Sequence, residues 1–187
     1  MIYLFLADGF EELEAVAPLD LLRRAGKNVA TVGVDGVGAN DGLREITGRN
    51  GIKIISDINI NEVKLGSDLE MIILPGGLPG VDNLYASDKV REAVTYCADN
   101  NIIIAAICAA PSIPGRMGLL AGKHATCYPG FEDKLTDASA TGEAVTVDGG
   151  FITAKSAGVS VQFALKLVEV LCGADKAAEI AKSIVYD

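Results

Sequence analysis

The chain has 187 residues, half of them hydrophobic, and it carries a formal net charge of -9 at neutral pH. This length suits one domain over residues 1–187, and the apolar content excludes a disordered protein. The acidic charge argues against a nucleic acid or an anionic membrane as a partner, and from the apolar runs and the N-terminal residues we expect neither a membrane-spanning segment nor a signal peptide.

The first half of the chain alternates apolar strands with helical patterns. A continuous apolar strand at residues 1–7 is followed by a helix that runs to about Ala25, where Gly26 is a natural stop. Asp8 is expected to cap this helix, because Glu11 follows it at the capping-box spacing. The next predicted elements are strands at 28–34, 43–47, 52–55 and 69–74, a Gly-rich loop at 35–42, a turn at 50–51 and a helix at 87–100.

The first helix carries a carboxyl group on its apolar side. At about 100° per residue, Glu12 falls on the polar side with Asp20, whereas Glu14 falls within the apolar arc beside Leu21. Burial there favours the protonated form of Glu14 and is costly without a hydrogen-bonding partner. The alternative interpretation is that Glu14 caps a loop or is exposed by local fraying of the helix.

The stretch 101–118 is typical of a strand, a sharp turn and a helix, with Cys108 at the turn. Pro111 suits the first turn of a helix. Ala106 and Ala110, two residues to either side of the thiol, are as small as a nucleophile elbow requires. A helix N-terminus would also favour the thiolate. The alternative is that Cys108 is a buried structural cysteine, as most free cysteines are.

The predicted elements beyond the elbow complete an α/β pattern. They are a strand at 123–128, two strands at 144–147 and 151–154 joined by a hairpin turn, and helices at 159–171 and 174–185. This alternation predicts a doubly wound, mostly parallel sheet with helices on both faces and a small antiparallel hairpin.

The other cysteines and the single histidine are not expected to be catalytic. Cys97 and Cys172 lie at packing positions on or at the end of predicted helices, and the four cysteines form no C-x-x-C pair. This spacing disfavours a zinc site and a disulfide scaffold, so we expect no metal and a reducing, cytoplasmic location. His124 lies near a strand start beside Lys123, and we expect it to be solvated rather than catalytic.

The remaining candidates can meet at one edge of the sheet. Cys108, Glu14 and the loop that contains Gly76 and Gly77 all follow the carboxyl ends of predicted strands, where α/β folds bind ligands. A Gly-rich loop lets backbone N–H groups approach a ligand closely, although such loops alone are weak evidence.

The chain resembles the DJ-1/ThiJ/PfpI family, in its DJ-1-like branch, over nearly its whole length. The matching stretches are D-G-F-E-E-L-E-A with P-L-D-L-L-R-R-A-G, L-P-G-G-L-P-G, A-A-I-C-A-A-P, C-Y-P-G-F-E-D-K-L and Q-F-A-L-K-L-V-E. The resemblance implies a flavodoxin-like sandwich of the class I glutamine amidotransferase-like type and usually a homodimer. It places the reactive cysteine of the family on Cys108 and its acidic partner on Glu14. The backbone N–H groups that hold an oxyanion would come from Gly77 and Ala109, with Gly76 in the same loop.

Three positions depart from relatives. Tyr128 stands where some members carry a histidine, and it offers only a hydroxyl near the cysteine. Ala109 stands where the protease branch carries a histidine, which argues against peptidase activity. A basic residue of some relatives falls near Asn50, with Arg49 adjacent, so anion binding there is left open.

The resemblance implies two kinds of function. The first is a cofactor-independent glyoxalase or deglycase that acts on methylglyoxal-type 2-oxoaldehydes or on glycated thiols and amines. The second is an oxidative-stress sensor or holdase chaperone in which Cys108 is oxidised to the sulfinate. Both functions use Cys108 and Glu14, so the sequence does not separate them.

Overall fold

The computed structural model describes residues 1–34 and 44–186. The loop predicted at 35–42 and the first residue of the strand predicted at 43–47 lie outside the described residues. Within the described part of the chain, the main sheet has the spatial order β10-β11-β7-β6-β1-β2-β5. Its strands are β1 (Ile2–Leu6), β2 (Val29–Gly33), β5 (Ile58–Asn59), β6 (Met71–Leu74), β7 (Ile103–Ile107), β10 (Val145–Asp148) and β11 (Phe151–Ala154).

Neighbouring strands of this sheet are parallel except β10 and β11, which form the predicted antiparallel hairpin. The central strands are continuous apolar sequences because helices cover both faces of the sheet. The predicted doubly wound, mostly parallel α/β fold is therefore confirmed. The helices are α1 (Glu12–Arg24), α2 (Gly80–Ala86), α3 (Asp88–Asp99), α4 (Ser112–Arg116), α5 (Ser160–Cys172) and α6 (Ala174–Ser183).

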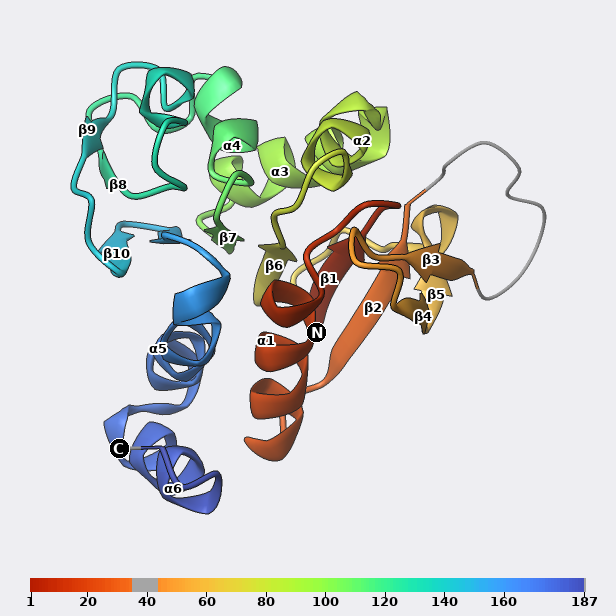
Figure 1. Cartoon of the computed structure of the whole chain (residues 1–187), viewed down its shortest axis with the longest axis vertical. Coiled ribbons are helices and arrows are strands. Elements are labelled where there is room, and N and C mark those ends of the chain that lie inside the picture. Colours follow the sequence, from red (N-terminus) through yellow and green to blue (C-terminus); the bar gives the residue numbers. More distant parts are fainter. Residues whose placement is uncertain (35–43, 187) are drawn as a thin grey trace.

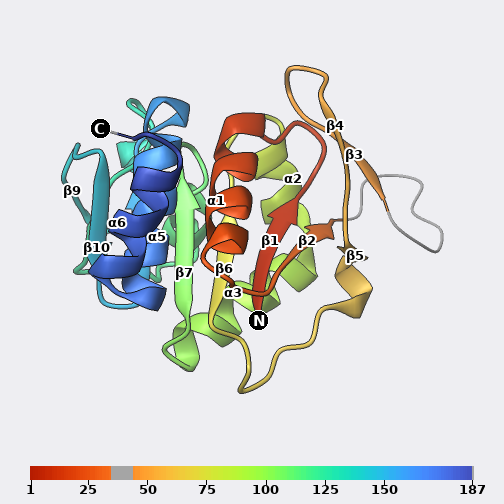
Figure 2. The ribbon, with the colours of Figure 1, turned by 90° about the horizontal axis from the view of Figure 1, so that it is seen from below.

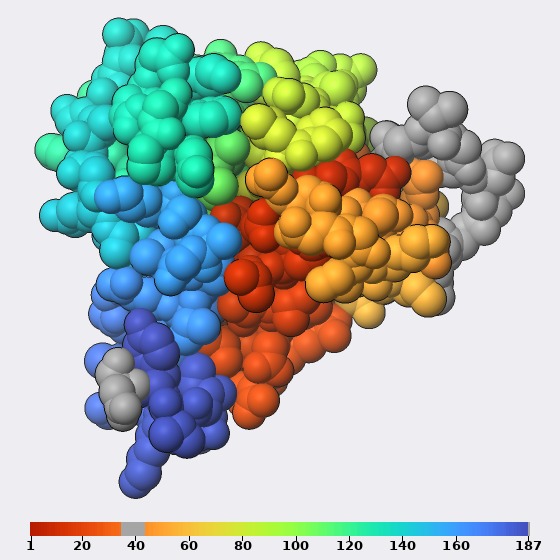
Figure 3. All heavy atoms as spheres, in the orientation of Figure 1, coloured from red at the N-terminus to blue at the C-terminus, as the bar shows by residue number. Residues whose placement is uncertain are grey.

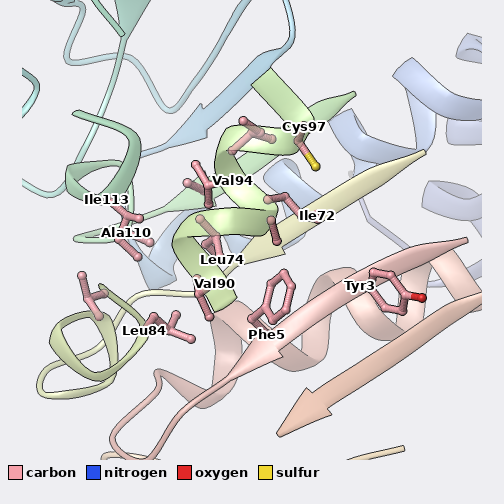
Figure 4. Packing of buried hydrophobic residues seen from close by; sticks show 14 of the residues in the cluster. Tyr3, Phe5, Ile72, Leu74, Leu84, Val90, Val94, Cys97, Ala110 and Ile113 are labelled. Atoms are coloured by element: carbon pink, nitrogen blue, oxygen red, sulfur yellow. The ribbon is translucent and has the colours of Figure 1, made fainter. Parts of the chain in front are cut away.

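The helices form two layers around the sheet. Figure 1 shows α2, α3 and α4 on one side of the strands and α1, α5 and α6 on the other, and Figure 2 shows the molecule from below. Side chains of β1 alternate between the two sides: Tyr3 and Phe5 pack in the cluster that contains Val90 of α3, whereas Ile2 and Leu4 pack in the cluster under α1 and α5. Figure 4 shows Phe5 and Val90 in the first cluster. These two clusters fix the sheet from both faces, and the carboxyl ends of its parallel strands lie along one edge.

Helix α1 begins later than predicted. Its first residue is Glu12, and Asp8 does not cap it. Asp8 instead accepts a hydrogen bond at Oδ1 from the backbone N–H of Thr47, at 2.9 Å. The predicted cap is therefore wrong, because a strand distant in sequence supplies the donor. The predicted end is confirmed, since Gly26 follows the helix with a φ of +81°.

A hairpin of β3 (Glu45–Thr47) and β4 (Lys53–Ile55) lies against the start of α1. Figure 3 shows the orange atoms of this segment beside the red atoms of the N-terminal segment. Glu12 is only 5% exposed, because its carboxylate accepts hydrogen bonds from the backbone N–H and the Nδ2 of Asn50, both at 2.8 Å. The hairpin therefore covers the polar side of α1 at the position of Glu12.

Some short elements differ from the prediction. The edge strand β5 and the helix α2 were not predicted, and the strand predicted at 123–128 is reduced to β8 (His124–Ala125). This strand pairs with β9 (Ser139–Ala140) in a separate small sheet. None of the helices in the described part of the chain is long and apolar enough to cross a membrane.

Candidate active site

Cys108 occupies a strained turn directly after β7. Its φ of +65° is rare for a residue with a side chain. The turn is fixed from two sides, because its N–H donates to the carbonyl of Ala154 at 2.8 Å and its carbonyl accepts from the N–H of Tyr128 at 2.7 Å. Helix α4 begins four residues later. The strand, the turn and the helix thus have the order predicted for a nucleophile elbow.

Glu14 lies beneath this turn and is completely buried. Its Oε2 accepts a hydrogen bond from the backbone N–H of Gly76 at 2.8 Å, whereas its Oε1 has no hydrogen-bond partner among the described residues. Burial raises the pKa of Glu14 from 4.5 to about 7, although the Cys108 thiol and the Gly76 N–H both oppose this shift. Near neutral pH the carboxyl group therefore exchanges readily between its acidic and basic forms.

The loop after β6 approaches the thiol so closely that it needs glycine. A Cβ atom on Gly76 would lie 2.6 Å from Oε2 of Glu14 and 2.7 Å from Cβ of Cys108. Gly77 has a φ of +89°, and a Cβ there would lie 2.5 Å from the carbonyl oxygen of Gly9. These glycines let the loop contact both the carboxyl group and the thiol. The N–H of Gly76 is used by Glu14, which leaves Gly77 and Ala109 as donors toward the sulfur.

The thiol and the carboxyl group are electrostatically coupled. Burial, followed by the charge of Glu14, raises the pKa of Cys108 to about 12, while the N–H groups of Ala109 and Gly77 lower it. The sequence suggested that a helix N-terminus would stabilise the thiolate. This effect does not prevent the rise in the pKa of Cys108, since α4 has only five residues. Because the repulsion requires an ionised Glu14, protonation of the carboxyl group removes it and favours the thiolate. At a pH between these two pKa values the pair holds one negative charge, which lies mainly on Glu14 and moves to the sulfur when the thiol transfers its proton to the carboxylate.

A cavity of about 500 Å³ opens over this pair. Its wall includes Phe131, whose ring meets that of Tyr128 edge to face at 6.3 Å between centroids. The lining residues are Glu11, Glu14, Arg49, Gly77, Leu78, Cys108, Ala109, Tyr128, Phe131, Ser156, Ala157 and Gly158. Residues 156–158 were not predicted, although they follow the carboxyl end of β11 and the strand-end rule could have found them.

The other predicted site residues have different positions. Tyr128 lines the cavity, with 47% of its surface exposed. Asn50 is absent from the lining because its amide is bound to Glu12, and the neighbouring Arg49 reaches the cavity instead. His124 is exposed beside Asp148 and is not among the lining residues. In residues 1–34 and 44–186, no group of three or more His, Cys, Asp or Glu residues is placed to hold a metal ion.

A model of the DJ-1/PfpI family matches this sequence over residues 1–170. The match includes the elbow, the buried carboxyl group and the Gly-rich loop. The chain belongs to the DJ-1/PfpI family. Protein DJ-1 homolog B of Arabidopsis thaliana is 37% identical over 179 residues, which cover 95% of this chain and 39% of that protein. The chain thus spans about two fifths of the length of the Arabidopsis relatives that it matches.

Two animal relatives match over most of their own length. The Parkinson disease protein 7 homolog of Danio rerio is 36% identical, with coverage of 96% of this chain and 94% of that protein. A Caenorhabditis elegans protein named glutathione-independent glyoxalase DJR-1.2 is 29% identical, with coverage of 93% and 89%.

Solved structures of DJ-1 proteins confirm the fold. A DJ-1 superfamily protein of Salmonella typhimurium superposes with a TM-score of 0.90 at 29% identity, covering 100% of this chain and 98% of that one. Oxidised DJ-1 of Toxoplasma gondii superposes with a TM-score of 0.89 at 30% identity, covering 99% and 97%.

Proposed function

We propose that this protein is a cofactor-independent glyoxalase or deglycase that uses Cys108 and Glu14 on 2-oxoaldehydes or on their thiol and amine adducts. The observation that carries the proposal is the pairing of a strained thiol with a buried carboxyl group whose pKa is about 7, in one cavity of about 500 Å³. The glyoxalase name of the Caenorhabditis elegans relative supports this reaction class.

The first step forms a covalent adduct. Glu14 takes the thiol proton, and the sulfur of Cys108 attacks the aldehyde carbon of methylglyoxal, whose C=O π bond opens to an alkoxide. The N–H groups of Gly77 and Ala109 lie beside the sulfur, where they can stabilise this negative charge. Glu14 returns the thiol proton to the alkoxide, which gives a hemithioacetal and leaves Glu14 as a carboxylate.

The second step moves hydrogen between the two carbonyl carbons. Glu14 as carboxylate removes the proton from the carbon attached to sulfur, and the electron pair forms an enediolate, in which the hydroxyl proton on that carbon passes to the second oxygen. The protonated Glu14 then delivers the proton to the neighbouring carbon, which leaves a thioester of lactate. One water hydrolyses the thioester, so the sum of the reaction is methylglyoxal plus water giving lactate. A group with a pKa near 7 suits both roles.

The test is direct measurement of lactate from purified protein and methylglyoxal without glutathione or added metal. We expect lactate to form in proportion to protein concentration and methylglyoxal to disappear at the same rate. Consumption of methylglyoxal without lactate would indicate simple adduct formation on lysine and arginine side chains, and it would contradict the proposal.

A redox function is supported by a different observation. Oε1 of Glu14 is buried without a partner, and in the protonated carboxyl group it could donate a hydrogen bond to an oxidised sulfur of Cys108. The structure of the oxidised Toxoplasma gondii relative is consistent with such chemistry in the family.

Mild peroxide treatment tests this redox function. By peptide mass spectrometry we expect two oxygen atoms to be added at Cys108 before Cys97 and Cys127, which are buried, and before Cys172, which is also only partly buried but lies outside the cavity. Oxidation of Cys172 at the same rate as Cys108 would contradict a tuned sensor.

A further inference from the structure

The tip of the β3–β4 hairpin is attached to the start of α1 by a buried carboxylate. Oε1 of Glu12 accepts hydrogen bonds from the backbone N–H groups of Asn50 at 2.8 Å and Ile52 at 3.4 Å, and Oε2 accepts from Nδ2 of Asn50. These hydrogen bonds lower the pKa of Glu12 despite its burial, so the group is an anion. A buried anion with three donors from one surface turn fixes the position of that turn.

This attachment places the side chain of Arg49 at the cavity. The backbone N–H of Arg49 donates to the carbonyl of Phe10 at 2.9 Å, so the residue is held from both sides of the turn. Its guanidinium lines the cavity that contains Cys108 and Glu14. Among the described residues that line this cavity there is no other arginine or lysine.

The guanidinium of Arg49 retains most of its binding capacity. Its Nε lies 3.6 Å from Oε2 of Glu11, which is the one side-chain pairing of Arg49 among the described residues. The side chain is 48% exposed, which leaves these donors accessible to a ligand. A guanidinium presents paired donors in a fork that matches a carboxylate or a phosphate.

The charge of the cavity permits an added anion. Glu11 and Arg49 together are neutral, and burial keeps Glu14 about half protonated at neutral pH and largely protonated below it. The cavity volume of about 500 Å³ also lies in the range of sites that enclose ligands much larger than three-carbon methylglyoxal. The space beyond the reacting carbonyl group can therefore hold a substrate tail.

We propose that Arg49 is a specificity residue that binds an anionic group on the tail of the substrate, so that the preferred substrates are 2-oxoaldehydes bearing a carboxylate or a phosphate. This inference rests on the proposed glyoxalase function. Arg49 holds the anion, Cys108 attacks the aldehyde carbon at the other end, and Glu12 acts as a positioning residue through the hairpin. Methylglyoxal reacts as the tailless member of this class.

The test compares 4,5-dioxopentanoate with its uncharged methyl ester and with methylglyoxal. We expect kcat/KM for the acid to exceed that for the ester by roughly tenfold or more, mainly through KM, because charge-assisted hydrogen bonds to a guanidinium are strong. The product of the acid is 2-hydroxyglutarate. The preference should decrease at high ionic strength, since the guanidinium is half exposed.

Two variants of Arg49 and one control identify the source of the preference. Arg49→Gln should reduce the acid-to-ester ratio to near one, and Arg49→Lys should retain part of it. Lys53→Gln removes the same charge from the same hairpin, but Lys53 pairs with Glu45 and does not line the cavity, so the ratio should equal that of the wild type.

The outcomes separate this inference from the proposed function. Equal kcat/KM for acid and ester, a preference for the ester, or an unchanged ratio in Arg49→Gln would overturn the role of Arg49 while leaving the glyoxalase function intact. Absence of turnover with all three substrates would contradict the glyoxalase function and this inference together.

Discussion

Replacement of Cys108 by serine is expected to reduce lactate formation from methylglyoxal by at least roughly a thousandfold, since loss of a covalent nucleophile has effects of that order or larger. The serine hydroxyl fits the same strained turn, so the fold and the cavity should persist. Serine is a much weaker nucleophile than the thiolate, and no histidine lines the cavity to activate it. The measurement is the initial rate of lactate formation, with circular dichroism and thermal unfolding to verify that the variant is folded.

Cys172→Ser is the matched control for this prediction. Cys172 is half-buried, as Cys108 is, but it lies at the end of α5 and does not line the cavity. The control should therefore keep the rate of the wild type. Substantial turnover by Cys108→Ser would contradict the nucleophile assignment, and an equal loss in Cys172→Ser would indicate that thiol loss acts through stability.

The regular part of the fold could be predicted because each long element carries its own pattern. Apolar runs of strand length specify the central parallel strands, and helical periodicity placed Glu14 on the buried side of α1, where the structure has it. The small residues around Cys108 similarly indicated the sharp turn. These signals are local, so the sequence contains them without knowledge of the tertiary contacts.

The remaining features depend on contacts between distant segments. Helical periodicity placed Glu12 on the polar side of α1 and gave no sign of its burial, because periodicity describes only the helix and not the hairpin that covers it. For the same reason Asp8 satisfied the capping pattern but bonds to Thr47. Arg49 rather than Asn50 reaches the cavity because Asn50 is used to attach the turn. Short elements such as β5 carry too few residues to show a period. The homodimer implied by the family resemblance stays a prediction.

Replacement of Glu14 by glutamine is expected to separate catalysis from stability. The amide cannot exchange a proton near neutral pH, so lactate formation should decrease by roughly a hundredfold to ten-thousandfold, the usual contribution of a general acid–base group. The backbone N–H of Gly76 keeps an acceptor, because the amide oxygen can take the place of Oε2. The rate measurement therefore reports the proton transfer rather than a lost contact in the loop.

The same variant should change how stability depends on pH. The pKa of Glu14 is about 7 in the folded protein and 4.5 ordinarily, so the folded state binds its proton more tightly than the unfolded state. The resulting stabilisation is complete below pH 4.5 and is lost as the pH rises through 7, which lowers the free energy of unfolding by about 3 kcal/mol. Glutamine lacks this titration. Compared with the free energy of unfolding of Glu14→Gln, that of the wild type should therefore decrease by about 3 kcal/mol between pH 4.5 and about pH 8.

Urea denaturation at several pH values in this range measures the difference directly. Carboxyl groups whose pKa is lowered, such as Glu12 and Asp57, are present in both proteins and cancel in the comparison. The buried amide has no evident partner at the position of Oε1, and this adds a cost that does not vary with pH. The slope is thus diagnostic even when the variant is less stable at every pH. If the difference in unfolding free energy between the two proteins stays constant across the range, the pKa of Glu14 is not raised by folding. This result would contradict the proton transfer between Glu14 and Cys108 that the proposed mechanism uses.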